Sequence, residues 1–492
     1  MPDHNGMLSF SSIQAQLPAE WNEANLRALI QKMNEALHRK IIVLDDDPTG
    51  VQTVHHVDVL TQWDKELLRD ALNKRETVLY ILTNTRGLDA AAAERINREI
   101  AENVQAVAGE TGRKVVFVSR SDSTLRGHYP LETDILSEGM KRLTGKAYDG
   151  HLIIPAFIEG GRVTYKNTHY ILDGDMMIPA HESEFAKDTV FGYQHGNLTR
   201  WVSEKTDGRV QPEDCFIITL DQLRKGPLAV EKALMEVQGN KPVIVNALSY
   251  SDLDVLSLAL LRAESKGKSF IFRTAASFVK SYGGITDLAY LPKEKLIAKG
   301  QEAHGGLIVV GSFVQKTTRQ LEQLLNSSDM VPLQLEVDKI LDPAERANEL
   351  KRLTNDVNEL LAQGNNVVVY TSRKLVARDN KSDNFKISHT VSTALVQIVQ
   401  SLSVVPKFII AKGGITSSDI ATKGLNIRKA RVLGQVSAGV PVWLTGDEAK
   451  FSGIPYIIFP GNVGTDKTLL ETVLKIENPE NTGLIVPKKD IL

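Results

Sequence analysis

The feature that most restricts the fold of this chain is a series of short apolar runs, rich in Val and Ile, separated by longer charge-bearing stretches. Each run is too short for a typical helix and does not alternate strictly, a pattern typical of strands buried on both faces of a parallel sheet. Strands that alternate with helices predict an α/β fold. The runs are KIIVLDD (40–46), TVLYILT (77–83), KVVFVSR (114–120), HLIIPAF (151–157), CFIITL (215–220), KPVIVNA (241–247), LIVVGS (307–312), NNVVVYTS (365–372), KFIIAKGG (407–414) and YIIFPGN (456–462).

Two of the intervening stretches carry helix signals. Between the second and third runs, LDAAAAERINREIAENVQAVAGETG has Asp89 as a cap near its start and Gly112 past its end. Ahead of the first run, apolar residues recur at helical spacing, which predicts a helix that packs on the fold or serves oligomerisation. That apolar face comprises Trp21, Leu26, Leu29, Ile30, Met33 and Leu37.

The alternation is interrupted at residues 291–306, LPKEKLIAKGQEAHGG, and this indicates a domain boundary. The length of 492 residues allows two to four domains at roughly 150 residues each. We predict two Rossmann-like domains with mainly parallel sheets that face a shared cleft. The predicted division is a helical extension at 1–39, a first domain at 40–295, a second domain at 300–480 and a tail at 481–492.

Composition narrows the class of protein. The net charge of −2 provides no basic field for a nucleic-acid backbone. The single cysteine, Cys215, excludes an internal disulfide framework and a multi-cysteine metal cluster. The N-terminal residues lack the pattern of a signal peptide, and no run approaches the ~18 apolar residues of a membrane span. We therefore expect a cytoplasmic protein with no nucleic-acid or membrane partner.

Polar residues follow four of the first-domain runs, where the carboxyl ends of parallel strands collect ligands. The segments are DDDPTG (45–50), TNTRG (83–87), SRSDSTLRG (119–127) and PAFIEGGR (155–162). Arg86, Arg126 or Arg162 could bind a carboxylate through two parallel hydrogen bonds, and Asp side chains can accept hydrogen bonds from sugar-type hydroxyls. Each segment alone also fits a capping loop, but four together favour a site for a small polyhydroxylated anion.

The second domain carries glycine-rich segments of a different kind. Its glycines would let backbone N–H groups approach a polyphosphate, with hydroxyls or a helix N-terminus completing the cradle. Neither GxxxxGK[ST] nor GxGxxG after the first strand is present, and a pair such as Gly413-Gly414 also fits a simple αβ turn. The segments are GSFVQKTTRQ (311–320), KGGITSSDI (412–420), GQVSAGVPVW (434–443) and PGNVGTDKT (460–468).

Taken in order, these motifs resemble the four-carbon acid sugar kinases, a family that includes threonate, erythronate and 3-oxo-tetronate kinases. The resemblance covers about residues 40 to 475. The first-domain matches are DDxTG, the pair Thr83 and Arg86, DSTLRG (122–127) and PAF…GR (155–162). The second-domain matches are Gly311, Ser312, Thr317 and Gln320, then Gly413 to Ser417, Gly434 to Pro441, and Gly461 to Gly464.

The resemblance implies ATP-dependent phosphorylation of a hydroxyl on a four-carbon sugar acid, with the acid on the N-terminal domain and the nucleotide on the C-terminal domain. By position, Asp46 and Asp47 match the catalytic acids, and Asp45 is an extra carboxylate. The substrate side is Arg86, Asp122, Ser123, Arg126 and Arg162. The nucleotide side is Ser312, Gly413, Gly414, Thr416, Ser417, Gly461, Asn462 and Gly464.

Three departures from the family pattern are visible. Pro48 replaces an aromatic residue before Thr-Gly, Arg120 replaces a lysine, and Phe459 replaces the lysine that opens the late glycine motif. A cation for the nucleotide phosphate is thus missing unless Lys412 or Lys467 substitutes.

For the mechanism we expect arginines to hold the substrate carboxylate while Asp46 or Asp47 accepts the proton of the attacking hydroxyl. The other acid would orient that hydroxyl or contact Mg²⁺, whose ligands are otherwise unknown. Crowding of like charges is expected to raise the pKa of one of the acids, which suits a base. The expected partners are a small sugar acid and ATP, and a homodimer is left open. The alternatives are a catalytically silent sensor of sugar acids or nucleotides and, less favoured, a dehydrogenase or aldolase.

Overall fold

The computed structural model describes residues 8–312, 314–372, 381–461 and 463–477, and side chains are described for all of these except 381–386. The chain divides into a first unit, Met1–Asp287, and a second unit, Leu288–Leu492. The predicted tail at 481–492 lies outside the described residues. Within the described part of the chain, no helix combines the length and apolar character needed to cross a bilayer.

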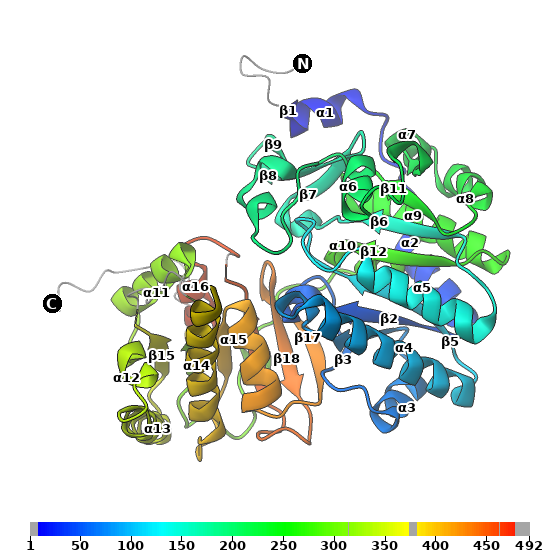
Figure 1. Cartoon of the computed structure of the whole chain (residues 1–492). Helices are drawn as coiled ribbons and strands as arrows, with labels where there is room; N and C mark the ends of the chain where they lie inside the picture. The colour runs from blue at the N-terminus through cyan, green and yellow to red at the C-terminus, as the bar shows by residue number, and fades with distance from the viewer. Residues whose placement is uncertain (1–7, 313, 373–380, 462, 478–492) are drawn as a thin grey trace. The chain divides into compact units, whose positions relative to one another are not determined.

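The first unit is built on a parallel sheet in the order β10-β11-β6-β12-β5-β2-β4-β3 (Figure 1). β2 lies between β4 and β5, so the direction of winding reverses there, and ligand sites form at such switch points. The strands are β2 (Arg39–Asp45), β3 (Asp58–Leu60), β4 (Val78–Leu82), β5 (Lys114–Arg120), β6 (Gly150–Ile154), β10 (Phe216–Ile218), β11 (Lys241–Val245) and β12 (Phe270–Thr274).

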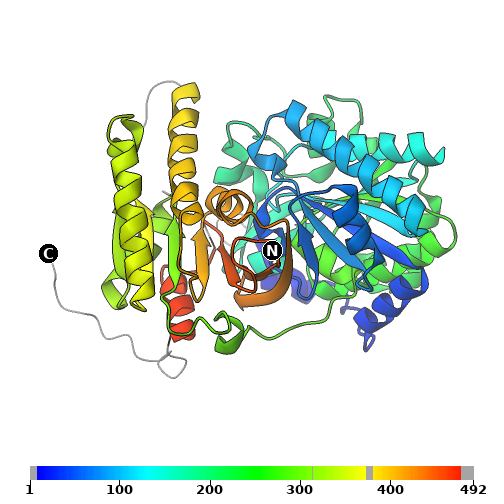
Figure 2. The ribbon, with the colours of Figure 1, turned by 90° about the horizontal axis from the view of Figure 1, so that it is seen from below.

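Helices cover both faces of this sheet, as Figure 2 shows. α3, α4 and α5 pack side by side, and their apolar residues form one core with residues of β2 and β4. α2, α7, α8 and α10 pack on α9. The helices of the unit are α1 (Phe10–Gln16), α2 (Leu26–Ala36), α3 (Lys65–Asn73), α4 (Ala90–Thr111), α5 (Leu131–Thr144), α6 (Leu198–Lys205), α7 (Leu220–Arg224), α8 (Pro227–Glu236), α9 (Tyr250–Ser265) and α10 (Ala276–Tyr282).

A small antiparallel sheet, in the order β1-β9-β8-β7, completes the first unit and was not predicted. Its strands are β1 (Leu8–Ser9), β7 (Arg162–Tyr165), β8 (Thr168–Asp173) and β9 (Met176–Pro179).

The second unit has a mixed sheet in the order β17-β18-β19-β16-β13-β15-β14. Its pairs are parallel from β19 to β14, and β17 and β18 are antiparallel. α11 and α16 pack together on the sheet, and α12 to α15 form a separate group of contacting helices (Figure 2). The elements are β13 (Leu307–Val310), α11 (Gln315–Ser327), β14 (Val331–Leu335), α12 (Val337–Leu341), α13 (Arg346–Ala362), β15 (Val367–Thr371), α14 (Lys381–Gln400), β16 (Ile409–Lys412), α15 (Gly414–Asp419), a π-helix (Ile420–Gly424), β17 (Lys429–Ser437), β18 (Val440–Thr445), β19 (Pro455–Phe459) and α16 (Thr468–Glu477).

The predicted α/β class with mainly parallel sheets is confirmed, and each of the ten predicted runs contains a strand. The long helix is confirmed as well: the Asp89 carboxylate accepts from Ala92 N at its start, and Gly112 ends it with φ of +67°. One segment was misread. GQVSAGVPVW (434–443) is a hairpin of β17 and β18, because two strands meet at the Ala438-Gly439 turn and leave no separate glycine loop.

The predicted N-terminal helical face is only partly correct. α2 begins at Leu26 because Asn25 takes a left-handed conformation (φ 66°), so Trp21 lies ahead of the helix, and Leu29 is exposed. The helix is fixed to the first unit through Asn34, whose side-chain amide donates to the carbonyl oxygen of Tyr282 at 2.7 Å.

Candidate functional site

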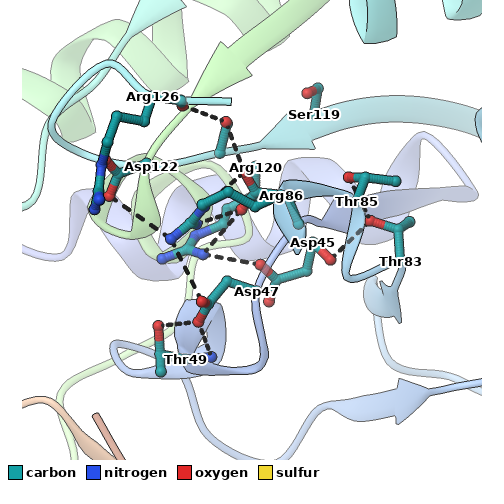
Figure 3. A network of polar contacts seen from close by, with 12 residues as sticks. Asp45, Asp47, Thr49, Thr83, Thr85, Arg86, Ser119, Arg120, Asp122 and Arg126 are labelled. Atoms are coloured by element: carbon teal, nitrogen blue, oxygen red, sulfur yellow. Dashed lines mark hydrogen bonds and ion pairs between the residues drawn. The ribbon is translucent and has the colours of Figure 1, made fainter. Parts of the chain in front are cut away.

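The candidate site of the first unit forms where β2, β4 and β5 end side by side. Asp45, the last residue of β2, pairs in register with Leu82 of β4 and Arg120 of β5. The loops that follow, 46–50, 83–87 and 121–127, therefore start from one edge of the sheet. Three of the four predicted polar segments are brought together in this way (Figure 3).

Asp45 is the most deeply buried of the three adjacent aspartates in the cluster. Its carboxylate bonds to Nη1 of Arg120 at 2.9 Å, and both side chains are almost fully buried. A Cβ at Gly50 would lie 2.1 Å from the carboxylate oxygens, which explains why glycine closes the DDDPTG segment. Burial, offset in part by Arg120, raises the pKa of Asp45 to about 7.

Asp46 is held by three donors. Arg86 contacts both of its carboxylate oxygens, through Nε at 3.1 Å and Nη2 at 2.5 Å, and the Ser121 hydroxyl donates at 2.9 Å. Such a bidentate pair fixes both partners in orientation. The bond from Ser121 depends on the absence of a side chain at Gly127, where φ is +117° and a Cβ would lie 2.3 Å from the hydroxyl oxygen.

Asp47 is the most accessible of the three acids, because its side chain is 20% exposed whereas that of Asp46 is 2% exposed. One carboxylate oxygen accepts from the backbone N and the hydroxyl of Thr49, at 2.9 and 2.5 Å. The other lies 3.4 Å from Nη1 of Arg86. Burial alone would raise the pKa of Asp47, but Arg86 and Thr49 outweigh it and lower the pKa below its ordinary value.

The expected raised pKa therefore belongs to Asp45 and not to Asp47. The cause is depth: Asp45 still lies within the strand and under Gly50, whereas Asp47 has turned out of the strand and caps the 3₁₀ turn Pro48–Val51.

Asp122 and Arg126 form the second half of the cluster. Arg126 Nε bonds to Asp122 at 2.8 Å, and Arg86 Nη1 lies 3.8 Å from the same carboxylate. Although burial opposes it, the two guanidinium groups hold the pKa of Asp122 well below its usual range. Ser123 is placed through its backbone, since its carbonyl oxygen lies 2.7 Å from Nε2 of the buried His169.

Arg162 differs from these arginines. It opens β7, donates to the carbonyl oxygen of Gly160, and forms no ion pair within the described residues. Its Nε is buried without a hydrogen-bond partner, and burial lowers its pKa. Because its guanidinium group has no carboxylate partner, Arg162 still has N–H donors that could bind an anion.

Two further residues support the cluster and were not predicted. Arg273 of β12 is fully buried and donates to the carbonyl oxygens of Asp122 and Arg126, at 3.0 Å each. Glu132 of α5 accepts from the hydroxyls of Thr85 and Ser119, at 2.6 and 3.1 Å. Arg273 was detectable as a charge inside the apolar run FIFRT, but nothing separates Glu132 from a surface glutamate in the sequence.

The predicted nucleotide segments of the second unit also meet at strand ends. Ser312 follows β13, and its hydroxyl accepts from Thr317 at 3.3 Å. Thr317 also donates to the carbonyl oxygen of Gly461 at 3.0 Å, and Gln320 donates to those of Val463 and Thr465 at 3.0 and 2.7 Å. The spacing of Thr317 and Gln320 places both on the face of α11 that holds the loop after β19.

Gly413 and Thr416 pack against the loop after β13. A Cβ at Gly413, where φ is +114°, would lie 3.0 Å from Cβ of Ser312, and one at Gly311 would lie 2.3 Å from the Thr416 hydroxyl oxygen. Gly414 is the first residue of α15. Ser417 is fully buried and donates to the carbonyl oxygen of Ala411 at 2.7 Å, which removes its hydroxyl from ligand contact.

The loop after β19 carries the remaining predicted residues. Gly464 has φ of +79°, and its carbonyl oxygen accepts from Nζ of Lys316 at 2.9 Å. Asn462 lies outside the described residues. Of the two lysines considered as substitutes for the family cation, Lys467 is exposed and Lys412 is fully buried beside Phe459.

The described residues include no group of three or more His, Cys, Asp or Glu side chains arranged to hold a metal ion.

Two family models match the chain, one within each of the two structural units. Residues 41–282 match a family described as a sugar-binding N-terminal domain, and residues 307–469 match a nucleotide-binding C-terminal domain. A D-erythronate kinase of Heliobacterium modesticaldum (strain ATCC 51547 / Ice1) is 26% identical over 327 residues, which are 64% of this chain and 67% of that protein.

Two solved structures share the fold. A proposed tRNA synthase from Salmonella typhimurium LT2 superposes with a TM-score of 0.65 at 17% identity, over 88% of this chain and 98% of its own. The Haemophilus influenzae protein HI1011 gives 0.61 at 18% identity, over 88% of this chain and 100% of its own. With both domain matches in order along one chain, this protein belongs to the four-carbon acid sugar kinase family.

Proposed function

We propose that the protein is an ATP-dependent kinase that phosphorylates a hydroxyl group of a four-carbon sugar acid. The observation that carries the proposal is the cluster at the ends of β2, β4 and β5, where one reachable carboxylate, Asp47, stands beside fixed arginines. The matched sugar-binding and nucleotide-binding domains support the two substrates, and the D-erythronate kinase relative supports the acid class.

Asp47 is the proposed acceptor for the attacking hydroxyl. Its lowered pKa keeps it ionised at neutral pH, so it accepts a hydrogen bond from the hydroxyl, orients the oxygen for attack and takes up the hydroxyl proton as the new O–P bond forms. Phosphoryl transfer asks the protein mainly for positioning and charge neutralisation, so a strongly basic acceptor is not required. Asp46, with Arg86 on both oxygens, serves to hold that arginine beside Asp47.

Arg162 is the proposed receptor of the substrate carboxylate. Arg86 and Arg126 already face aspartates, whereas Arg162 has no carboxylate partner within the described residues. A substrate carboxylate would supply the missing partner and recover the cost of burying the guanidinium.

ATP is the proposed phosphoryl donor, and Mg²⁺ would neutralise its phosphate oxygens. The groups of this chain proposed for the nucleotide are Ser312, the backbone at Gly413 and Gly414, Thr416, and the loop at Gly461 and Gly464. Their contribution is hydrogen-bond donors and space, because none of these residues carries a carboxylate.

The test is turnover of ATP with a panel of four-carbon sugar acids by wild type, Asp47→Asn and Asp221→Asn. Loss of the Asp47 charge should lower kcat by about 100- to 10,000-fold while nucleotide affinity is unchanged. Asp221 is an exposed acid in α7, so its replacement controls for the loss of one negative charge.

Residual activity of Asp47→Asn within tenfold of wild type would contradict the role of Asp47. If wild type binds an acid but consumes ATP with none of the panel, the silent sensor is the better function.

A further inference from the structure

Lys412 is a buried lysine at the strand ends of the second unit. It is the last residue of β16 and is fully buried. Its Nζ donates to the carbonyl oxygens of Pro460 and Gly461, at 2.5 and 3.2 Å, and lies 4.4 Å from the centre of the Phe459 ring. No carboxylate among the described residues forms an ion pair with it.

The groups that face Lys412 are the carbonyl oxygens of Pro460 and Gly461, the ring of Phe459 and one other cation, Lys316. Burial, and then the charge of Lys316 on α11, lower the pKa of Lys412 to about 7. The nearest acid in sequence, Asp419 at the far end of α15, is occupied by Lys423 at 2.7 Å and by the Ser392 hydroxyl at 2.5 Å. β13 and β19, the strands on either side of Lys412, pair with it through Val310 and Phe459.

Burying an ammonium group without a counter-ion costs free energy of folding. An anionic ligand that binds beside Lys412 would supply the counter-ion and recover this cost. The carbonyl oxygen of Gly461, which Lys412 contacts, also accepts from Thr317, and Thr317 contacts Ser312. The carbonyl oxygen of Gly461, in the loop after β19, therefore links Lys412 by hydrogen bonds to Thr317 and Ser312, next to the glycines proposed for the nucleotide.

We propose that Lys412 is the residue that neutralises a phosphate group of the bound nucleotide, and that it takes up a proton from solvent when the nucleotide binds. On binding, Nζ exchanges its bonds to the Pro460 and Gly461 carbonyls for phosphate oxygens. This inference rests on the proposed function, because it assumes a nucleotide in the second unit. Lys412, on the strand next to Phe459, would supply the positive charge of the lysine that the family usually has at position 459.

The experiment is calorimetric titration of the full-length protein with Mg-ADP at pH 8, in two buffers of different ionisation enthalpy. At this pH, a group with a pKa near 7 is mostly neutral. Wild type should therefore take up close to one proton for each nucleotide bound. Its dissociation constant should rise about tenfold from pH 8 to pH 9, because binding then has to protonate the lysine.

Three variants identify the group. Lys412→Arg stays charged at all these pH values, so it should bind without proton uptake and with little dependence on pH. Lys412→Met should bind at least tenfold more weakly. Lys351→Met, which removes an exposed lysine on α13 of the same unit, should behave like wild type.

The outcomes separate this inference from the proposed function. Binding by wild type without proton uptake, or Lys412→Met with an affinity within twofold of wild type, overturns the role of Lys412 and leaves the kinase proposal standing. No nucleotide binding by wild type overturns both. If Lys412→Met does not fold, the proton uptake of wild type against Lys412→Arg decides the matter.

Discussion

In the first unit, Arg86 and Arg120 face carboxylates at the strand ends, whereas Lys412 of the second unit faces only carbonyl oxygens and an aromatic ring. Both groups of residues lie at the carboxyl ends of parallel strands. In the first group the aspartates are matched by arginines, and Arg162 alone among the arginines proposed for the substrate has no carboxylate partner among the described residues. The group is therefore suited to a ligand with many hydroxyls and a single negative charge. The second leaves a cation unmatched, which suits a ligand with several negative charges.

The largest expected effect comes from removing one cation in each unit. Arg120→Met leaves Asp45 as a buried, unpaired carboxylate and should destabilise the first unit by about 3–5 kcal/mol. Lys412→Met leaves no opposite charge behind and also removes the cost of burying the ammonium group, so the second unit should lose at most about 1 kcal/mol for its hydrogen bonds. Hydrogen exchange of peptides covering β2 and β16 measures the two losses separately. Equal losses in both units would contradict the difference in charge pairing.

The two units should also respond to pH in opposite directions. An unfolded aspartate titrates near pH 4, whereas Asp45 in the folded protein has a pKa of about 7. Between these values only the folded state holds the proton, so this group stabilises the protein most below pH 4 and the contribution is lost by pH 7. The first unit should lose about 1.4 kcal/mol per pH unit over this window through Asp45.

For Lys412 the sign is reversed. Its pKa is about 7 in the folded protein and near 10.5 when unfolded, so between these values only the unfolded state holds the proton. The second unit should therefore gain stability as the pH rises from 7 to 10. Hydrogen exchange at a series of pH values, corrected for the intrinsic rate, measures both slopes. Asp45→Asn and Lys412→Met should flatten the respective curves, and unchanged slopes would contradict these assignments.

A smaller effect tests the packing beneath the paired charges. Gly50→Ala places a methyl group about where the Asp45 carboxylate now lies, and should cost about 1–3 kcal/mol as the loop shifts. Gly87→Ala is the matched control, because nothing lies within 4 Å of a Cβ there. Thermal unfolding of the two variants compares them. A loss in both would indicate that backbone freedom, and not contact with Asp45, explains the glycine.

Much of the fold was accessible from the sequence because buried parallel strands leave a strong local pattern. Each apolar run marked a strand, and the polar residues at or just after the ends of three runs marked the sheet edge where Asp46, Arg86 and Asp122 now meet. The misread segment, 434–443, failed because glycines in a β-hairpin and glycines in a phosphate loop look alike without the pairing partner.

The division of labour among the acids could not be predicted, because it depends on depth. Asp45, Asp46 and Asp47 are chemically identical and adjacent, yet one lies under Gly50, one is clamped by Arg86 and one is partly exposed. Arg273 and Glu132 were missed for a related reason: their partners are 151 and 47 residues away in the sequence.

The position of β12 in the sheet has a consequence for folding during synthesis on the ribosome. β12 lies between β5 and β6, although it is the last strand of the first unit to be synthesised. A nascent chain that has emerged only as far as Lys268 has the other seven strands of this sheet but lacks one from its interior. Its 122–126 loop also lacks both hydrogen bonds from Arg273. The strands β3, β4, β2 and β5 can pair before β12 is made, but the sheet of the first unit becomes continuous, and the loop bearing Asp122 gains these hydrogen bonds, only after β12 has been synthesised.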